Sequence, residues 1–151
     1  MLTKRPCLPE DRGFVYGLMK DNMADYFRRN TREGWSYEKF NRGFESSRIT
    51  IFEIDGVPIG FYDIEEICDG APYMYVRNVQ VDKKKRGHGL RLIQLLDEEA
   101  RKRGLNIIRG KVFRENERAL LLLQHLGCSV ADEELEGENS VYVEKRLDVI
   151  S

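Results

Sequence analysis

The stretch from Tyr73 to Leu96 constrains the fold of this chain more than any other segment. It reads YMYVRNVQV, then DKKKRGHG, then LRLIQLL. The first part has the Tyr and Val content of a strand, and the last part has apolar residues at helical spacing, so the sequence predicts a strand, a glycine loop and a helix start. Glycines let backbone N–H groups approach an anion, and the first turn of a helix presents unpaired donors. We therefore expect a phosphate group to bind at this junction.

The length of 151 residues predicts a single domain spanning residues 1–151. Charged residues make up 34% of the chain, against a typical share of about 25%, and the net charge is −1. Such a balanced surface argues against nucleic acid and against an anionic membrane as partners.

The three cysteines are too few and too scattered for a disulfide framework or a zinc site; they are Cys7, Cys68 and Cys128. The N-terminal residues lack the apolar core of a signal peptide, and no apolar run approaches the roughly 20 residues of a membrane helix. We expect a soluble, cytoplasmic protein without a metal.

Periodicity along the chain predicts an α/β fold with a mixed central sheet of about six to seven strands, flanked by about four helices. The expected helices run from Pro9 to about Phe27, from Ser36 to about Glu45, from Gly89 to Arg103, and from Glu117 to His125. The expected strands are Leu2–Cys7, two around the Asp55-Gly56 turn, Pro72–Val81, Asn106–Phe113, Cys128–Val130 and Ser140–Leu147. An acidic link, Asp63–Gly70, is expected between the second long strand and the third.

The glycine loop admits several phosphate-binding interpretations, and spacing separates them. A dinucleotide fingerprint would need a third glycine where Leu92 stands, and a nucleotide-triphosphate loop would need Gly-Lys-Ser/Thr. Both are disfavoured. A lone Gly-x-Gly is also typical of a simple tight turn.

The glycine loop and a second motif further along the chain together resemble a known family. Lys84-Lys85-Arg86-Gly87-His88-Gly89 resembles the cofactor loop of the GNAT superfamily of acetyl-CoA-dependent N-acetyltransferases, with Lys84 in place of the usual Gln or Arg. Asn116-Glu117-Arg118-Ala119, followed by an apolar helix ending at Gly127, is similar to a second signature of that superfamily. The resemblance covers most of the chain and implies the acyl-CoA N-acyltransferase fold.

The resemblance also implies a cofactor site for acetyl-CoA as co-substrate. The exposed edge of the strand at Val79 and Val81 would pair with the pantetheine amides, and Asn116 would contact the pantetheine arm. The pyrophosphate would be held by backbone N–H groups of Arg86, Gly87, His88, Gly89, Leu90 and Arg91. Charge attraction from the lysines at 83–85 would add to this.

In the implied reaction a neutral amine attacks the thioester directly, and a strand N–H near Val79 would polarise the carbonyl. Many members protonate the departing thiolate with a Tyr on the last helix, but that position is Leu123 here. Water, Tyr142 or Cys128 would have to supply the proton instead.

The catalytic base has several candidates, namely Glu65, Glu66, Asp63 and a water oriented by Tyr75. We name Glu65 as the base and Tyr142 as the acid, although solvated surface charge is the ordinary interpretation of such carboxylates.

Only charge indicates the kind of acceptor. The acidic segments Asp63–Asp69 and Asp132–Glu138 would favour a cationic amine. The expected function is acetyl transfer to a primary amine of a small molecule or peptide. The alternative is a catalytically weak or inactive acyl-CoA-binding module. A homodimer is compatible with the resemblance.

Overall fold

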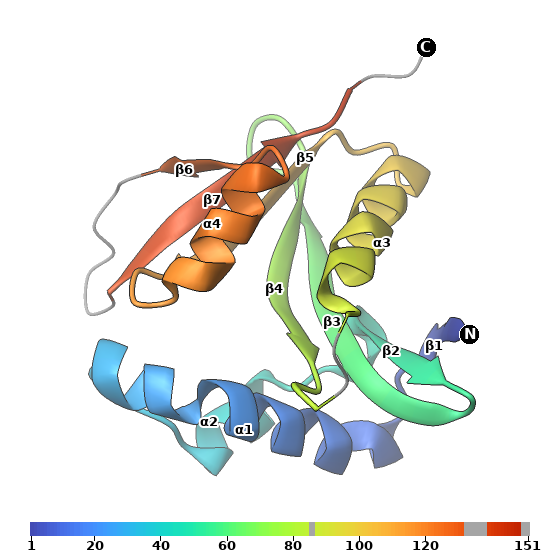
Figure 1. Ribbon diagram of the computed structural model, residues 1–151, viewed down its shortest axis with the longest axis vertical. Helices are drawn as coiled ribbons and strands as arrows, with labels where there is room; N and C mark the ends of the chain where they lie inside the picture. The colour runs from blue at the N-terminus through green and yellow to red at the C-terminus, as the bar shows by residue number, and fades with distance from the viewer. Residues whose placement is uncertain (85–86, 132–138, 149–151) are drawn as a thin grey trace.

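The computed structural model describes residues 1–84, 87–131 and 139–148, which form one mixed sheet with helices on both faces (Figure 1). The strands are β1 (Leu2–Pro6), β2 (Ile49–Ile54), β3 (Val57–Ile67), β4 (Tyr73–Val81), β5 (Ile107–Phe113), β6 (Ser129–Ala131) and β7 (Ser140–Arg146). The α-helices are α1 (Arg12–Asn30), α2 (Tyr37–Gly43), α3 (Gly89–Lys102) and α4 (Glu117–His125), with short 3-10 turns at Pro9–Asp11 and Ser46–Arg48. The expected fold class is confirmed.

The seven strands pair in the order β1-β2-β3-β4-β5-β7-β6. All neighbours are antiparallel except β4 and β5, which are parallel and joined by the α3 crossover. This parallel pair is short, since only Met74–Val76 is in register with Ile108–Gly110. Beyond Val76 the two strands separate, and the sheet opens in its middle (Figure 1).

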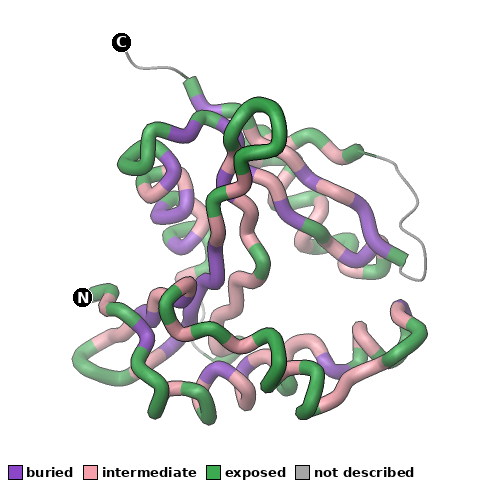
Figure 2. Tube along the Cα trace, turned by 180° about the vertical axis from the view of Figure 1, so that it is seen from behind, coloured by how far each residue is buried: buried purple, intermediate pink, exposed green. Residues whose placement is uncertain are grey.

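Two hydrophobic cores lie on opposite faces of the sheet. On one face α3 packs through Leu92 and Leu96 against the core around Tyr62 and Met74. On the other face α1 contributes Val15 and Leu18 to a core with the inward residues of β2 and β3, and α2 packs against it. Burial is concentrated along the central strands and, among the α-helices, on α1 and α3 (Figure 2).

Helix ends follow the capping residues of the sequence. The hydroxyl of Ser36 accepts a hydrogen bond from the N–H of Lys39 at 3.1 Å, and the Asn116 side chain accepts one from the N–H of Ala119 at 3.3 Å. After α3 the chain reverses at Gly104, whose φ of 74° suits glycine. The predicted ends of α2, α3 and α4 lie within two residues of the observed ones.

Three expected boundaries are wrong. The helix expected from Pro9 begins as α1 only at Arg12, after the 3-10 turn Pro9–Asp11. The acidic segment Asp63–Ile67 continues β3 and is not a link, because its backbone stays paired with β4 as far as Ile67, which is opposite Tyr73. Helix α1 runs on to Asn30, three residues past Phe27. The expected acidic loop Asp132–Glu138 lies outside the described residues. Within the described ranges, no helix is long and apolar enough to cross a membrane.

Candidate active site

A cleft of about 390 Å³ occupies the space between α3 and α4, where β4 and β5 separate. A β-bulge starts the separation: Ile64 is opposite Val76 and Asp63 is opposite Asn78, so Arg77 is the extra residue on β4. The bulge immediately follows Val76, the last residue of β4 that pairs with β5. Local backbone geometry therefore opens the cleft.

The cleft side of β4 presents backbone groups without a neighbouring strand. The N–H of Asp82 donates to the carbonyl of Ile59 at 2.8 Å, on the β3 side. Because successive residues of a strand alternate in direction, the N–H groups of Val79 and Val81 point away from β3 and toward the cleft. Both residues line the cleft, and this edge can accept an added strand-like ligand.

The N-terminus of α3 lies at the cleft and is uncapped. The helix begins at Gly89, and its N-cap residue His88 makes no side-chain capping hydrogen bond. The first-turn N–H groups, which include those of Leu90 and Arg91, therefore lack an intrahelical partner and are suited to an anion. A Cβ built on Gly89 meets nothing within 4 Å, so the space next to the helix start is open.

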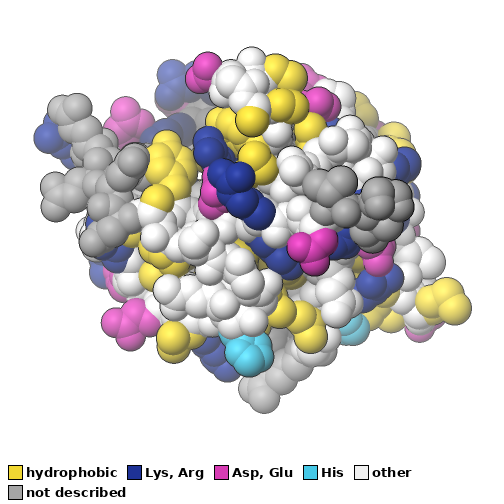
Figure 3. Space-filling view, turned by 90° about the horizontal axis from the view of Figure 1, so that it is seen from above, with side chains coloured by type: hydrophobic (Ala, Val, Ile, Leu, Met, Phe, Trp, Pro, Cys, Tyr) yellow, Lys and Arg dark blue, Asp and Glu magenta, His cyan; other side chains and the backbone are white. Residues whose placement is uncertain are grey.

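The predicted basic loop is described in part. Lys83 and Lys84 are exposed, and the N–H of Lys84 donates to the Asp82 carboxylate at 2.9 Å. Lys85 and Arg86 lie outside the described residues, whereas Gly87 has a φ of 90°. Elsewhere, on the face that Figure 3 shows, acidic and basic side chains are interspersed.

Asn116 lines the cleft from the start of α4. Its side-chain oxygen caps the helix, which leaves its amide nitrogen available to a ligand. The preceding residue, Glu115, accepts a hydrogen bond at 2.8 Å from the buried Asn30 at the end of α1. Asn30 in turn accepts one at 3.1 Å from Asn139, next to β7. These contacts fix the turn that carries Asn116.

Three other residues of interest line the cleft: Tyr75, Leu123 and Cys128. Leu123, at the position where the resemblance implies a Tyr, is half-buried on α4. Burial raises the pKa of the Cys128 thiol, so this thiol stays protonated at neutral pH.

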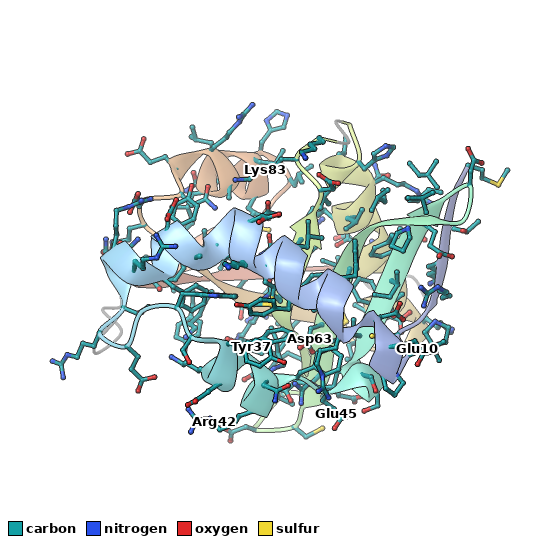
Figure 4. All side chains as sticks on the ribbon, turned by 90° about the horizontal axis from the view of Figure 1, so that it is seen from below. Glu10, Tyr37, Arg42, Glu45, Asp63 and Lys83 are labelled. Atoms are coloured by element: carbon teal, nitrogen blue, oxygen red, sulfur yellow. The ribbon has the colours of Figure 1, made fainter. Side chains whose placement is uncertain are left out.

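A second cavity, which we call the acceptor-side cavity, lies on the other face of β4, between that strand and helices α1 and α2. Its volume is about 170 Å³. Phe27, Arg77 and Asn78 line both this cavity and the cleft, so the two spaces adjoin where β4 leaves β5. Figure 4 looks onto α1, with Lys83 on one side of the helix and Asp63 and Tyr37 on the other.

Asp63 is the carboxylate that lines the acceptor-side cavity. The guanidinium of Arg48 donates to it at 3.0 Å, and Arg77 lies 3.8 Å away. Burial raises the pKa of Asp63, and the hydrogen bond from Arg48 opposes this effect. Asp63 is therefore a more basic carboxylate than a solvated one.

The two residues named as base and acid lie elsewhere. Glu65 is two residues further along β3 and is ion-paired with Arg77 at 3.2 Å. Tyr142 is on β7, and strand alternation places it on the opposite face from Val143, which lines the cleft. Among the described residues neither Glu65 nor Tyr142 lines the cleft or the cavity. Their roles stay predictions.

Sequence reasoning missed the residues that join the two spaces. From the sequence, Phe27 is only the approximate end of an expected helix, and Arg77 and Asn78 are only part of an expected strand. The signal available was the polar pair Arg77-Asn78 in the middle of an apolar strand, which is typical of a bulge or a site.

Comparison with known proteins is in line with this geometry. Residues 15–128 match the sequence profile described as acetyltransferase (GNAT) family. No curated protein is similar enough in sequence to count as a match.

Several solved structures share the fold. The ribosomal-protein-S18-alanine N-acetyltransferase from Escherichia coli superposes with a TM-score of 0.70 at 18% identity, over 100% of this chain and 97% of that chain. Ard1 from Thermoplasma volcanium gives 0.74 at 15% identity, over 98% and 99% of the two chains. Arabidopsis thaliana Naa50, in complex with the bisubstrate analogue CoA-Ac-MVNAL, gives 0.71 at 13% identity, over 97% and 99%.

Proposed function

Because the chain belongs to the GNAT family of N-acetyltransferases, we propose that it transfers an acetyl group from acetyl-CoA to a primary amine of a small molecule or peptide. The separation of β4 from β5 after Val76 carries this proposal. It gives a cleft with unpaired backbone donors on one side of β4 and a cavity on the other side. Two reactants can therefore meet through the opening.

In this proposal the cleft holds the cofactor. Val79 and Val81 on β4 pair with the pantetheine amides, and the amide nitrogen of Asn116 contacts the same arm. The uncapped start of α3 at Gly89 holds the pyrophosphate, with Lys83 and Lys84 adding positive charge. Bound acetyl-CoA supplies an activated thioester carbonyl.

Different residues of the described chain carry out the separate steps of the reaction. The N–H of Val79 donates to the carbonyl oxygen, on which negative charge develops during attack. The amine approaches from the acceptor-side cavity, and Asp63 accepts its proton directly or through a water, because burial raises the pKa of this carboxylate. No side chain with an acidic proton occupies position 123, so we propose that the thiolate takes its proton from water.

The fold relatives support an amine acceptor. One is described as acting on an alanine of a ribosomal protein, and another was solved with an analogue that joins CoA to a peptide. Both share the fold of this chain, which is why a peptide amine is kept within the proposal.

The proposal is tested in two steps. Acetyl-CoA at a hundredfold excess over its Kd should stabilise the folded protein by about 2.7 kcal/mol, which a thermal-shift assay would detect. Free CoA thiol should then appear when a panel of amines is added, together with the acetylated amine. If acetyl-CoA gives no shift, the cleft is not its site. If it gives a shift but no amine releases thiol, the protein binds the cofactor without transferring it.

A further inference from the structure

The acceptor-side cavity has aromatic walls that support one another. Tyr16 packs against Phe40 with ring centroids 5.1 Å apart, and Phe40 lies 5.7 Å from Phe44. Phe27 packs edge-on against Trp35 at 5.6 Å. Offset and edge-on contacts of this kind hold rings in place. The cavity is therefore preformed and predominantly apolar.

The charged groups that line the cavity are already matched. Asp63 faces two guanidinium groups, those of Arg48 and Arg77, and Lys39 is ion-paired with Glu33 at 2.9 Å. A cationic tail of an acceptor would lose its hydration here without finding a free counter-charge. Within this cavity, the contact pattern argues against a cationic acceptor, whereas the acidic segment Asp132–Glu138 lies outside the described residues.

The polar amide at the cavity is also engaged. Asn78 accepts a hydrogen bond from Gln80 at 2.7 Å and donates to the sulfur of Met19 at 3.3 Å. Gln80 is itself held by Asn22 of α1 at 3.1 Å. The indole N–H of Trp35, which also lines the cavity, is buried without a hydrogen-bond partner among the described residues. Beyond this one donor, the cavity offers mostly van der Waals contact to what enters it.

The size of the cavity limits its occupant. Its volume is about 170 Å³, and an apolar cavity of roughly 150 Å³ in another protein holds a benzene ring. Because Phe27, Arg77 and Asn78 line both spaces, a group that fills the cavity leaves its attached amine at the opening toward the cleft.

We propose that the acceptor is a primary amine bearing one uncharged, apolar group of about the size of a benzene ring, which fills the acceptor-side cavity. This inference rests on the proposed acetyl transfer and names its substrate class. Phenethylamine and hexylamine represent this class, and spermidine represents the cationic class that the cavity disfavours.

The test is the kcat/KM of thiol release for a series of primary amines from ethylamine to hexylamine, with phenethylamine and spermidine. Each methylene that enters the cavity should raise kcat/KM about fourfold, which is roughly 0.8 kcal/mol converted to a rate ratio, until the cavity is full. Phenethylamine should exceed spermidine by about a hundredfold.

Gly43, which is exposed and also lines the cavity, supplies a variant at the cavity's edge. It lines the cavity at the end of α2, and a Cβ built on it meets nothing within 4 Å. Gly43→Leu should lower the ratio of kcat/KM for phenethylamine to kcat/KM for ethylamine about tenfold or more. Gly13→Leu is the matched control, because Gly13 is exposed on α1 with equally open space around it. The control should keep the preference of the wild type.

The outcomes separate the two proposals. Equal kcat/KM along the amine series, or a preference for spermidine, would overturn the apolar acceptor and leave acetyl transfer standing. If acetyl-CoA gives the wild-type protein no thermal shift, the proposed function itself would be overturned. Should Gly43→Leu fail to fold, Gly43→Ala must still reduce the preference for phenethylamine, and an unchanged preference in it would count against the cavity.

Discussion

Gly89 is the residue on which the proposed cofactor site depends most. It begins α3 beside the cleft, and the space where its Cβ would lie is open, so the fold tolerates a side chain there. A carboxylate at this position would occupy the proposed anion site and repel a phosphate. Function and folding can therefore be tested separately at one position.

Gly89→Glu is expected to fold normally and to lose the thermal shift that acetyl-CoA gives the wild type. Acids are favoured in the first turn of a helix, which is why stability should be retained. Gly13→Glu places the same side chain in the first turn of α1, in equally open space, and should keep the full shift. A normal shift in Gly89→Glu would place the cofactor elsewhere.

Leu123 tests how the leaving thiolate obtains its proton. The residue lines the cleft from α4, so a Tyr hydroxyl at this position would reach into it. Leu123→Tyr is expected to raise kcat several-fold without changing the KM for acetyl-CoA, because an added acid assists the leaving group. Steady-state kinetics below pH 8 would check this. Leu121→Tyr, at an exposed position of the same helix, is the control. A decreased kcat in Leu123→Tyr would contradict the proposal that position 123 faces the leaving thiolate.

Helix α1 is the element that joins the two reactant sites, and both of its ends are anchored. At its start the Asp11 carboxylate accepts hydrogen bonds from Arg5 at 2.8 Å and 3.0 Å and one from the N–H of Leu8 at 2.8 Å. At its end Asn30 bonds to Glu115. Displacing either end would move Phe27, which lines the cleft and the cavity.

The start of α1 should give a pH-dependent contribution to stability. Hydrogen bonds from Arg5 lower the pKa of Asp11 below its unfolded value near 3.9. The stabilisation is therefore present above about pH 4 and is lost as the pH falls through the folded pKa. Urea unfolding should find Asp11→Asn less stable than the wild type by about 1–2 kcal/mol at pH 7.

The same unfolding series at falling pH completes that test. The difference between the wild type and Asp11→Asn should shrink as the pH approaches 3. Glu10→Gln, at an exposed residue in the same turn, should match the wild type throughout. A difference that stayed constant with pH would mean that the charge of Asp11 is irrelevant.

The end of α1 should affect cofactor binding at a distance. Asn30→Ala removes the hydrogen bonds to Glu115, to Asn139 and to the carbonyl of Tyr26, and should cost about 2–3 kcal/mol of stability. Because Glu115 precedes Asn116, the KM for acetyl-CoA should rise as well. Asn41→Ala, at an exposed position on α2, serves as the control. An unchanged KM would show that the anchor is only structural.

Elements with local signals could be predicted from the sequence. The strand, glycine loop and helix from Tyr73 to Leu96, and the helix capped by Asn116, depend on periodicity and capping within a few residues. The continuation of β3 through Asp63 could not be predicted, because its carboxylates are stabilised by Arg48 and Arg77 from neighbouring segments. The same holds for the bulge at Arg77, which is a matter of strand register.

At the scale of the whole molecule, the sheet separates two cores and opens once between them. The cleft on the α3 and α4 side and the cavity on the α1 and α2 side meet at that opening. The proposed cofactor site could be predicted from the sequence because its loop residues are close together in the chain. The acceptor-side cavity could not, because it is built from segments far apart in the chain. Its matched charges could be seen only once the chain was folded.

The most direct test follows the acetyl group itself. The wild type is incubated with acetyl-CoA labelled in the acetyl carbon and with phenethylamine, and the label is located after separation of the products. The account predicts label on the amine nitrogen, in equal amount to the free CoA thiol, and none with Gly89→Glu. Label that remains on CoA, in a sample where acetyl-CoA still stabilises the protein, would contradict it.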